Sequence, residues 1–147
     1  MTTVLSNRAS RQYVLDANAL SGFFEDREGT AGRTEKLLSE ALRQGSPLLM
    51  SAINWGEVFY VAWRLRGEHF AHQVEAKLQE LPIAVISADC ERASRAGALK
   101  QKYGLGYADA FAAELAIERG AWLVTADAEF QKVGRALSIY SLPRHLR

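Results

Sequence analysis

The chain has 147 residues and a net charge of +1, from 18 Lys and Arg against 17 Asp and Glu. This balance neither supports nor excludes a nucleic-acid partner, because a neutral total can conceal a basic rim around an acidic centre. Hydrophobic residues make up 48% of the chain, as in globular domains, and no apolar run is long enough to cross a bilayer. The single cysteine, Cys90, cannot form an internal disulfide, and the polar first residues do not form a secretory signal. We therefore expect a cytoplasmic protein with no membrane partner.

Strands and helices are predicted to alternate along a single domain at residues 12–147, after an N-terminal tail at residues 1–11 that has no periodicity. Short apolar runs predict five strands, at residues 13–15, 47–50, 82–86, 121–124 and 137–140. Helical spacing and end signals predict helices at residues 19–24, 30–43, between Ser51 and Gly67, 68–81, between Ser87 and Gly104, 107–119 and 129–133. The expected N-caps include Thr30, Ser51 and Ser87. This alternation favours an α/β fold with a mainly parallel sheet covered by helices on both faces.

Four acidic side chains stand out by their position in this pattern. Asp16 follows the first strand, Glu57 lies within the third helix, Asp109 is in the first turn of the helix at 107–119, and Asp127 follows the fourth strand. Helix capping is an alternative role for Asp16, and interaction with a helix dipole is one for Asp109 and Asp127. Glu57 lies among residues expected to be partly buried, where an unpaired carboxylate costs roughly several kcal/mol. Glu57 therefore needs a cation or a hydrogen-bond network.

These acids are predicted to meet at one edge of the sheet. Right-handed crossovers place the carboxyl ends of parallel strands side by side, and ligands of open α/β sheets bind in the crevice there. Carboxylates that converge repel one another, so the pocket is expected to hold a proton or a cation. Oxygen ligands suit Mg²⁺ or Mn²⁺, whereas the three histidines and Cys90 lack the spacing of a zinc site. Such a cation can activate water and neutralise charge on a phosphodiester, which indicates phosphoryl chemistry.

Four segments in a fixed order carry a resemblance to a known family. They are residues 14–18 (VLDAN), 54–58 (NWGEV), 107–113 (YADAFAA) and 123–130 (LVTADAEF). Together they resemble the PIN-domain ribonucleases, and in particular the VapC-type toxins of bacterial type II toxin–antitoxin modules. The resemblance runs from about residue 12 to the end of the chain and leaves out the predicted N-terminal tail.

The resemblance implies a three-layer α/β/α fold whose central five-stranded sheet has the strand order 3-2-1-4-5. It also implies an endoribonuclease that needs Mg²⁺ or Mn²⁺, a cognate antitoxin and a homodimer. By position, three side chains match the family's catalytic, metal-binding acids: Asp16, Glu57 and Asp109. Asp127 matches a fourth acid that supports a metal directly or through water, and Asn18 and Thr125 match polar residues that orient the acids.

Binding of RNA requires cations at the rim of the acidic pocket. The candidates are four side chains of the fifth helix and two at the end of the third: Arg92, Arg95, Lys100, Lys102, Arg64 and Arg66. Solvated surface charge is the alternative for each of them. The aromatic residues Trp55, Tyr60 and Trp63 are interpreted as core and interface bulk rather than as platforms for base stacking. Phe23 and Phe24 are either core or part of an apolar groove for an antitoxin segment.

Three other functions compete with the toxin. A phosphatase could use Asp16 as its nucleophile, but such enzymes place a second Asp where this chain has Asn18. A PIN-domain nuclease could act outside toxin–antitoxin modules, in RNA processing. A non-catalytic module could use the PIN fold only to assemble with partners, although the four retained acids argue against that role.

Overall fold

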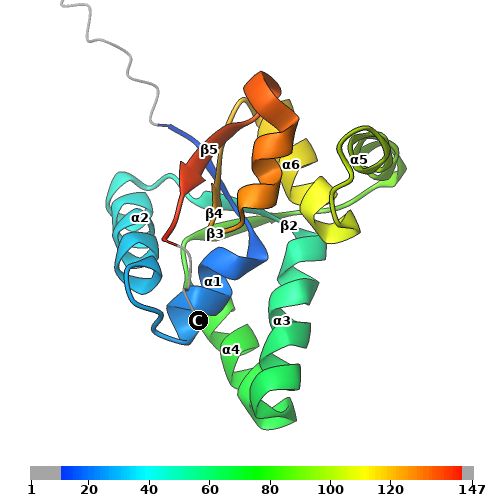
Figure 1. The fold of residues 1–147 in the computed structure, drawn as a ribbon. Coiled ribbons are helices and arrows are strands. Elements are labelled where there is room, and N and C mark those ends of the chain that lie inside the picture. The colour runs from blue at the N-terminus through cyan, green and yellow to red at the C-terminus, as the bar shows by residue number, and fades with distance from the viewer. Residues whose placement is uncertain (1–10, 144–147) are drawn as a thin grey trace, which may run out of the picture.

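The computed structural model describes residues 11–143, so all of the predicted tail except Arg11 lies outside the described residues. A single sheet with the order β3-β2-β1-β4-β5 forms the centre of the molecule, and every neighbouring pair of strands is parallel (Figure 1). The strands are β1 (Tyr13–Leu15), β2 (Leu48–Ser51), β3 (Ile83–Ile86), β4 (Trp122–Thr125) and β5 (Ser138–Ser141). The predicted fold class and strand order are therefore confirmed.

Six α-helices and a 3₁₀ segment connect these strands within residues 11–143. They are α1 (Ala17–Phe24), α2 (Thr30–Gln44), α3 (Ala52–Arg66), α4 (Glu68–Glu80), α5 (Cys90–Tyr103), α6 (Tyr107–Arg119) and η1 (Ala128–Ala136). Every predicted strand and helix is present, with ends that differ by a few residues. No helix in this part of the chain is both long and apolar enough to cross a membrane.

Ser51 is an N-cap as predicted, since its hydroxyl accepts a hydrogen bond from the N–H of Ile53 at 3.2 Å. The other two predicted N-caps are wrong. Thr30 is already helical and buried, and its hydroxyl donates to the carbonyl of Pro143 at 3.1 Å instead of capping. The helix after Ser87 begins later, where the Asp89 side chain accepts from the N–H of Arg92 at 2.9 Å.

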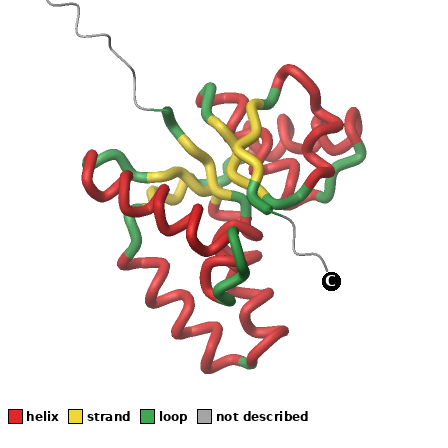
Figure 2. The backbone as a smooth tube through the Cα atoms, turned by 60° about the vertical axis from the view of Figure 1, so that its left-hand side comes forward, coloured by secondary structure: helices red, strands yellow, loops and turns green. Residues whose placement is uncertain are grey.

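Two apolar cores lie on opposite faces of the sheet, so the molecule has three layers. On one face, inward residues such as Leu15, Met50 and Val124 pack against α1, α2, α3 and α4. On the other face, alternate residues such as Val14 and Leu123 pack against α5, α6 and η1. Figure 2 shows the helices on both sides of the strands. The three central strands, β1, β2 and β4, are buried on both faces, as expected for a parallel sheet, whereas the edge strands β3 and β5 are partly exposed.

The sheet brings distant segments of the chain to the carboxyl end of β1. This strand lies in the middle of the sheet between β2 and β4, and the chain order reverses there, which is where open α/β sheets bind ligands. Helices α1 and α3 begin directly after β1 and β2, at this edge. Helix α6 ends just before β4, so the first turn of α6 lies at the same edge (Figure 1).

Candidate metal centre

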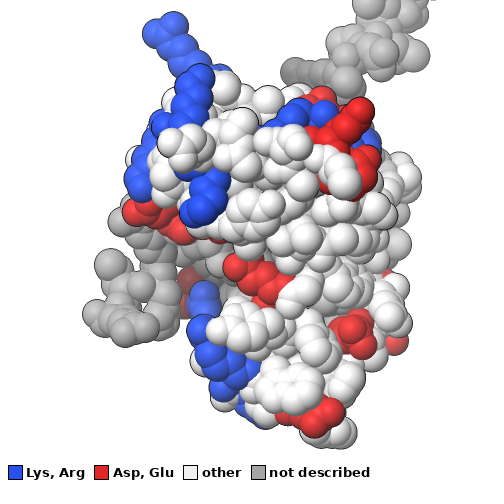
Figure 3. All heavy atoms as spheres, turned by 90° about the vertical axis from the view of Figure 1, so that its right-hand side faces the viewer, with Lys and Arg blue, Asp and Glu red and all other residues white. Residues whose placement is uncertain are grey.

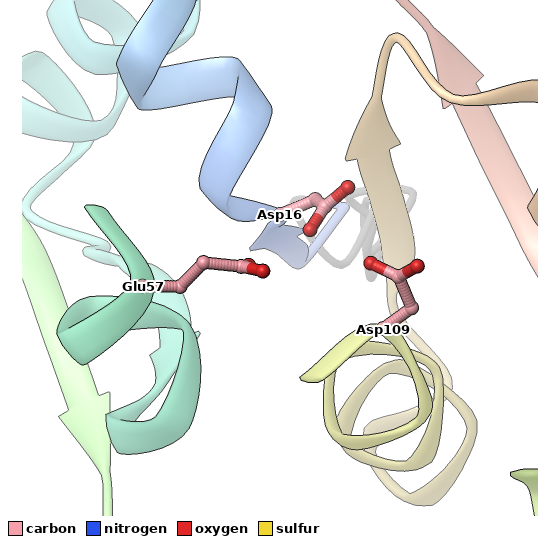
Figure 4. Close-up of side chains that lie close together, drawn as sticks. All are labelled: Asp16, Glu57 and Asp109. Carbon is pink, nitrogen blue, oxygen red and sulfur yellow. The ribbon is translucent and has the colours of Figure 1, made fainter. Parts of the chain in front are cut away.

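Three carboxylates from distant parts of the chain meet at the carboxyl end of β1. One oxygen atom each of Asp16, Glu57 and Asp109 lies within 4.8 Å of the other two. Figure 4 shows the three side chains directed toward one another from the β1–α1 junction, α3 and α6. The fold therefore brings together three of the four acids that the sequence singled out.

Asp16 is held by hydrogen bonds to both of its carboxylate oxygens. Its Oδ1 accepts from the N–H of Ala17 at 2.8 Å, so Asp16 is the N-cap of α1. Its Oδ2 accepts from the hydroxyl of Thr125 at 2.8 Å. The side chain is almost fully buried, with 2% of the residue exposed. These contacts fix the orientation of the carboxylate before any cation binds.

Thr125 is the centre of a small polar network that joins β4 to the start of α1. Its Oγ1 accepts from the Asn18 side-chain amide at 3.1 Å and from the N–H of Asp127 at 3.0 Å. The Oδ1 atom of Asn18 accepts from the N–H of Ala126 at 3.0 Å. Both polar residues named by the resemblance therefore support Asp16, Thr125 directly and Asn18 through Thr125.

Glu57 is half-buried, and Asn54 lies one helical turn before it on α3. The side-chain amide of Asn54 donates to the carbonyl of Ala108 at 3.1 Å and is fully buried. Burial raises the pKa of Glu57, and a hydrogen bond from the Asn54 side chain opposes this rise. Asn54 thus connects Glu57 to the residue before Asp109. Sequence reasoning missed Asn54, although its spacing of three residues from Glu57 places both on one side of a helix.

Asp109 occupies the first turn of α6, which starts after the N-cap residue Gly106. A Cβ atom at Gly106 would lie 3.1 Å from Oδ2 of Asp109, closer than most such contacts, so the carboxylate packs against the glycine. Burial raises the pKa of Asp109 to about 6, with further contributions from the negative charges of Glu57, Asp127 and Glu129. The carboxylate therefore holds its proton more strongly than an ordinary aspartate.

Asp16 shows the same effect more strongly. Burial raises the pKa of Asp16 to about 7, and the charges of Asp109 and Glu57 add to the rise, whereas the Thr125 hydroxyl opposes it. A buried cluster of mutually repelling carboxylates is stable only with bound protons or a cation. Carboxylate oxygens are hard ligands, and this group contains no histidine or cysteine, so the donor set fits Mg²⁺ or Mn²⁺.

Asp127 lies beside the three-carboxylate group and outside it. Its Oδ1 accepts from the N–H of Glu129 at 2.9 Å and caps η1. The negative charge of Asp127 nevertheless interacts with the group, because it contributes to the raised pKa of Asp109. This position is compatible with a supporting acid, which stays a prediction.

The four predicted RNA contacts of α5 all interact within the protein. Arg92 contacts Glu114 at 3.2 Å and Glu118 at 2.9 Å, and Arg95 contacts Glu114 at 2.9 Å. Nζ of Lys100 donates to the carbonyl of Leu105 at 3.0 Å, and Nζ of Lys102 lies 5.3 Å from the ring centroid of Tyr103. Arg92 is largely buried between two carboxylates, which gives it a structural role. An RNA role for the set of Arg92, Arg95, Lys100 and Lys102 stays a prediction.

A parallel sheet with carboxylates clustered at its switch point defines an α/β domain whose ligand site lies at the carboxyl ends of the strands. The family model of the PIN domain matches residues 13–136 of the chain. The chain therefore belongs to the PIN-domain family, whose members are nucleases that use divalent metals. The family prediction from the four sequence segments is confirmed.

Solved structures of toxins and toxin–antitoxin complexes share this fold. VapBC2 from Rickettsia felis, bound to a promoter DNA fragment, aligns with a TM-score of 0.68 and 17% identity over 88% of this chain and 98% of that chain. DNA-bound VapBC from Salmonella typhimurium aligns with a TM-score of 0.67 and 20% identity, over 89% of this chain and 98% of that chain. VapC20 from Mycobacterium tuberculosis, a toxin that cleaves the sarcin–ricin loop, aligns with a TM-score of 0.67 and 14% identity, over 84% of this chain and 95% of that chain. A comparison with curated proteins finds no match.

Proposed function

We propose that this protein is an Mg²⁺- or Mn²⁺-dependent endoribonuclease that acts as the toxin of a toxin–antitoxin module. The observation that carries the proposal is the meeting of Asp16, Glu57 and Asp109, with carboxylate oxygens within 4.8 Å of one another. Membership of the PIN-domain family supports nuclease chemistry. The solved structures of similar fold include VapC20 and several VapBC complexes, which supports the more specific role of a toxin.

In this mechanism Asp16, Glu57 and Asp109 would hold the cation, and Asp127 would support it from beside the group. The chemistry that Mg²⁺ or Mn²⁺ would supply there is an acidified water molecule and neutralisation of charge on the phosphodiester. The N–H of Ala17 and the hydroxyl of Thr125 donate to Asp16 and favour its ionised form, which is the form that binds a cation. Asn54 does the same for Glu57. The chain's own polar groups thus orient the ligands in advance.

The antitoxin partner is supported by the VapBC complexes among the structures of similar fold. A small apolar hollow lies between α1, α3 and α4, and its lining includes Phe24, Val61, Leu65 and Phe70. Leu65 is 51% exposed. We assign an apolar segment of the antitoxin to this surface, in keeping with the expectation for Phe24. The expected homodimer belongs to the same proposal, and light scattering of the purified protein tests it.

Cleavage of labelled RNA by the purified protein tests the nuclease. We expect endonucleolytic fragments with Mg²⁺ or Mn²⁺, none in chelator, and none from Asp16→Asn, which removes the charge but keeps the size of the side chain. Equal cleavage in chelator would contradict the role of the metal. No cleavage under any condition would favour a non-catalytic binding module.

Expression in bacterial cells separates a toxin from a nuclease of RNA processing. A toxin arrests growth when induced, and co-expression of its antitoxin restores growth. A protein that cuts RNA in vitro but leaves growth unchanged when induced would favour the RNA-processing role. Sequencing of the RNA ends produced on induction then identifies the target.

A further inference from the structure

We propose that Tyr60 and Arg64 of α3 form a binding site for the nucleotide next to the scissile phosphate of single-stranded RNA. In this site a base stacks on the Tyr60 ring and Arg64 binds a phosphate. The inference rests on the proposed nuclease function and adds to it the place where the substrate strand runs.

Helix spacing puts the two residues in line with the metal centre. Tyr60 and Arg64 follow Glu57 on α3 by three and seven residues, which are spacings that share one side of a helix. At a rise of about 1.5 Å per residue, Arg64 lies roughly 10 Å along the helix axis from Glu57. A strand whose scissile phosphate lies at the acids therefore passes Tyr60 before it reaches Arg64.

The Tyr60 ring is available for stacking. The residue is 56% exposed, so its interpretation as core is wrong, and its interpretation as interface bulk stays a prediction. Every base has a flat π face, so an exposed aromatic ring beside a cationic side chain is a usual platform for single-stranded nucleic acid. The ring lies one helical turn from Glu57, so a base next to the scissile phosphate can stack on it.

Arg64 lies beside this ring and forms no ion pair with another described residue. Its Nη1 donates to the Tyr60 hydroxyl at 3.2 Å, and its guanidinium carbon lies 5.3 Å from the ring centroid. None of the ion pairs within residues 11–143 includes Arg64, whereas Arg92 is paired twice. A pre-positioned guanidinium without a carboxylate is suited to phosphate.

Arg66 provides a matched comparison on the same helix. Its guanidinium carbon also lies near an aromatic ring, 5.1 Å from the centroid of Phe70, and it is likewise absent from those ion pairs. Arg66 follows Glu57 by nine residues, which places it on about the opposite side of α3. The structure thus separates two arginines that the sequence treated alike. On the face shown in Figure 3, basic side chains lie both above and below an acidic hollow.

Steady-state cleavage of a labelled single-stranded RNA by the full-length protein in Mg²⁺ tests the stacking platform. We expect Tyr60→Leu to raise KM about tenfold with a much smaller change in kcat, because the aliphatic side chain cannot stack on a base. Tyr60→Phe and Tyr60→Trp retain a ring and should keep KM within about threefold of the wild type. Unchanged melting temperatures show that the variants are folded.

The salt dependence of KM tests the phosphate contact. Arg64→Ala should raise KM and should reduce the slope of log(1/KM) against log salt by about 0.7, the value for one phosphate contact on a single strand. Arg66→Ala removes the same charge from the other side of α3 and should leave both quantities unchanged.

The possible outcomes distinguish this inference from the function on which it rests. Wild-type cleavage with an unchanged KM in both Tyr60→Leu and Arg64→Ala would overturn the nucleotide site and leave the nuclease intact. Equal effects of Arg64→Ala and Arg66→Ala would also overturn it, because net charge alone would then explain them. Weaker antitoxin binding with unchanged KM would assign the pair to the protein partner instead. Absence of cleavage by the wild type would overturn the proposed function itself.

Discussion

Asp16 is both a helix cap and a member of the acidic cluster, which the sequence offered as alternatives. It caps α1 through Oδ1, and it contributes to the three-carboxylate group. Capping explains why an acid at a strand end is compatible with folding, and convergence with Glu57 and Asp109 gives it a chemical use. A residue at a strand end can therefore serve the backbone and the site together.

The raised pKa of Asp16 predicts that the site costs stability. The pKa of Asp16 is 3.8 in the unfolded chain and about 7 in the folded protein. Between pH 3.8 and about pH 7 the folded state therefore keeps a proton that the unfolded state has lost. Stability without metal therefore falls as pH rises from about 4 to about 7. We expect Asp16→Asn to raise the free energy of unfolding by roughly 1–3 kcal/mol at pH 8 in chelator.

Urea unfolding of both proteins measures this change. At pH 4 the native carboxyl group is already protonated, so Asp16→Asn should then give little gain. A loss of stability at pH 8 would show that the carboxylate contributes more as a helix cap than it costs through burial.

Asn54 is predicted to position the metal ligands. Its amide donates to the carbonyl of Ala108 and thereby links α3 to the first turn of α6, and its side chain opposes the rise in the pKa of Glu57. Asn54→Leu keeps the size of the side chain but removes both effects. We expect the Mg²⁺ concentration for half-maximal cleavage to rise about 10- to 100-fold, the usual effect of losing a group that orients a metal ligand.

Thr30→Val is a suitable control for Asn54→Leu, since Thr30 is also buried and donates to a backbone carbonyl, that of Pro143. It should change stability without changing the metal requirement. If the two variants need equal Mg²⁺, Asn54 has a purely structural role.

Sequence patterns identified the acids of this site more completely than they identified the side-chain contacts between helices. Asp16, Glu57 and Asp109 could be found because each is a charged residue in a position that packing alone does not explain. The pairing of Arg92 could not be found, because its partner Glu114 follows it by 22 residues and on another helix. Side-chain contacts between elements depend on packing angles that a single sequence does not contain.

At the scale of elements, the contact between α5 and α6 combines an apolar core with one buried carboxylate. Glu114 on α6 is 3% exposed and pairs with Arg92 and Arg95 on α5. Glu114→Ala leaves Arg95 without its ion pair and leaves Arg92 with Glu118 alone, and we expect it to lower the free energy of unfolding by about 2–4 kcal/mol. The shift of the urea midpoint measures this loss.

Glu118 provides the comparison for Glu114, because it also pairs with Arg92 but its side chain is 39% exposed. An exposed pair contributes less than about 1 kcal/mol, so Glu118→Ala should have a much smaller effect. Equal losses in the two variants would contradict the importance of burial at Glu114.

The elements themselves were predictable, and their ends were less so. The alternation of apolar runs and helical spacing gave all five strands and every helix, because strand and helix periods differ clearly. Thr30 and Ser87 were wrong as caps, since capping depends on the backbone geometry of one residue. A glycine with φ of 79° precedes α2, and Asp89 replaces Ser87 at the start of α5.

At the scale of the whole molecule, cation binding and proton binding compete for the same group. The pKa of Asp16 is about 7 and that of Asp109 is about 6, so both carboxyl groups must release their protons before they can bind a metal ion. We expect the rise in melting temperature caused by millimolar Mn²⁺ to be small at pH 5.5 and to increase up to about pH 8.

Differential scanning fluorimetry over this pH range tests the competition, with Asp109→Asn as a variant in which the pH dependence is weaker. A metal effect that is constant across pH, or one that is retained in chelator, would argue against the carboxylate group as the site.

The strand order illustrates what a single sequence lacks. Alternating strands and helices predict a parallel sheet, but several orders of five strands satisfy the handedness rule. The order 3-2-1-4-5 came from the family resemblance carried by the four acidic segments, and the structure has that order. Topology was therefore accessible through a known family and not through local patterns.

The central place of β1 has a consequence for synthesis of the protein. This first strand pairs with β4, and Asp16 depends on a hydroxyl from Thr125, 109 residues later. A nascent chain cannot complete the acidic group until most of its length has emerged from the ribosome. In the proposed toxin, the chain therefore stays inactive during its synthesis. An antitoxin already present in the cell can bind the protein as soon as β4 joins the sheet.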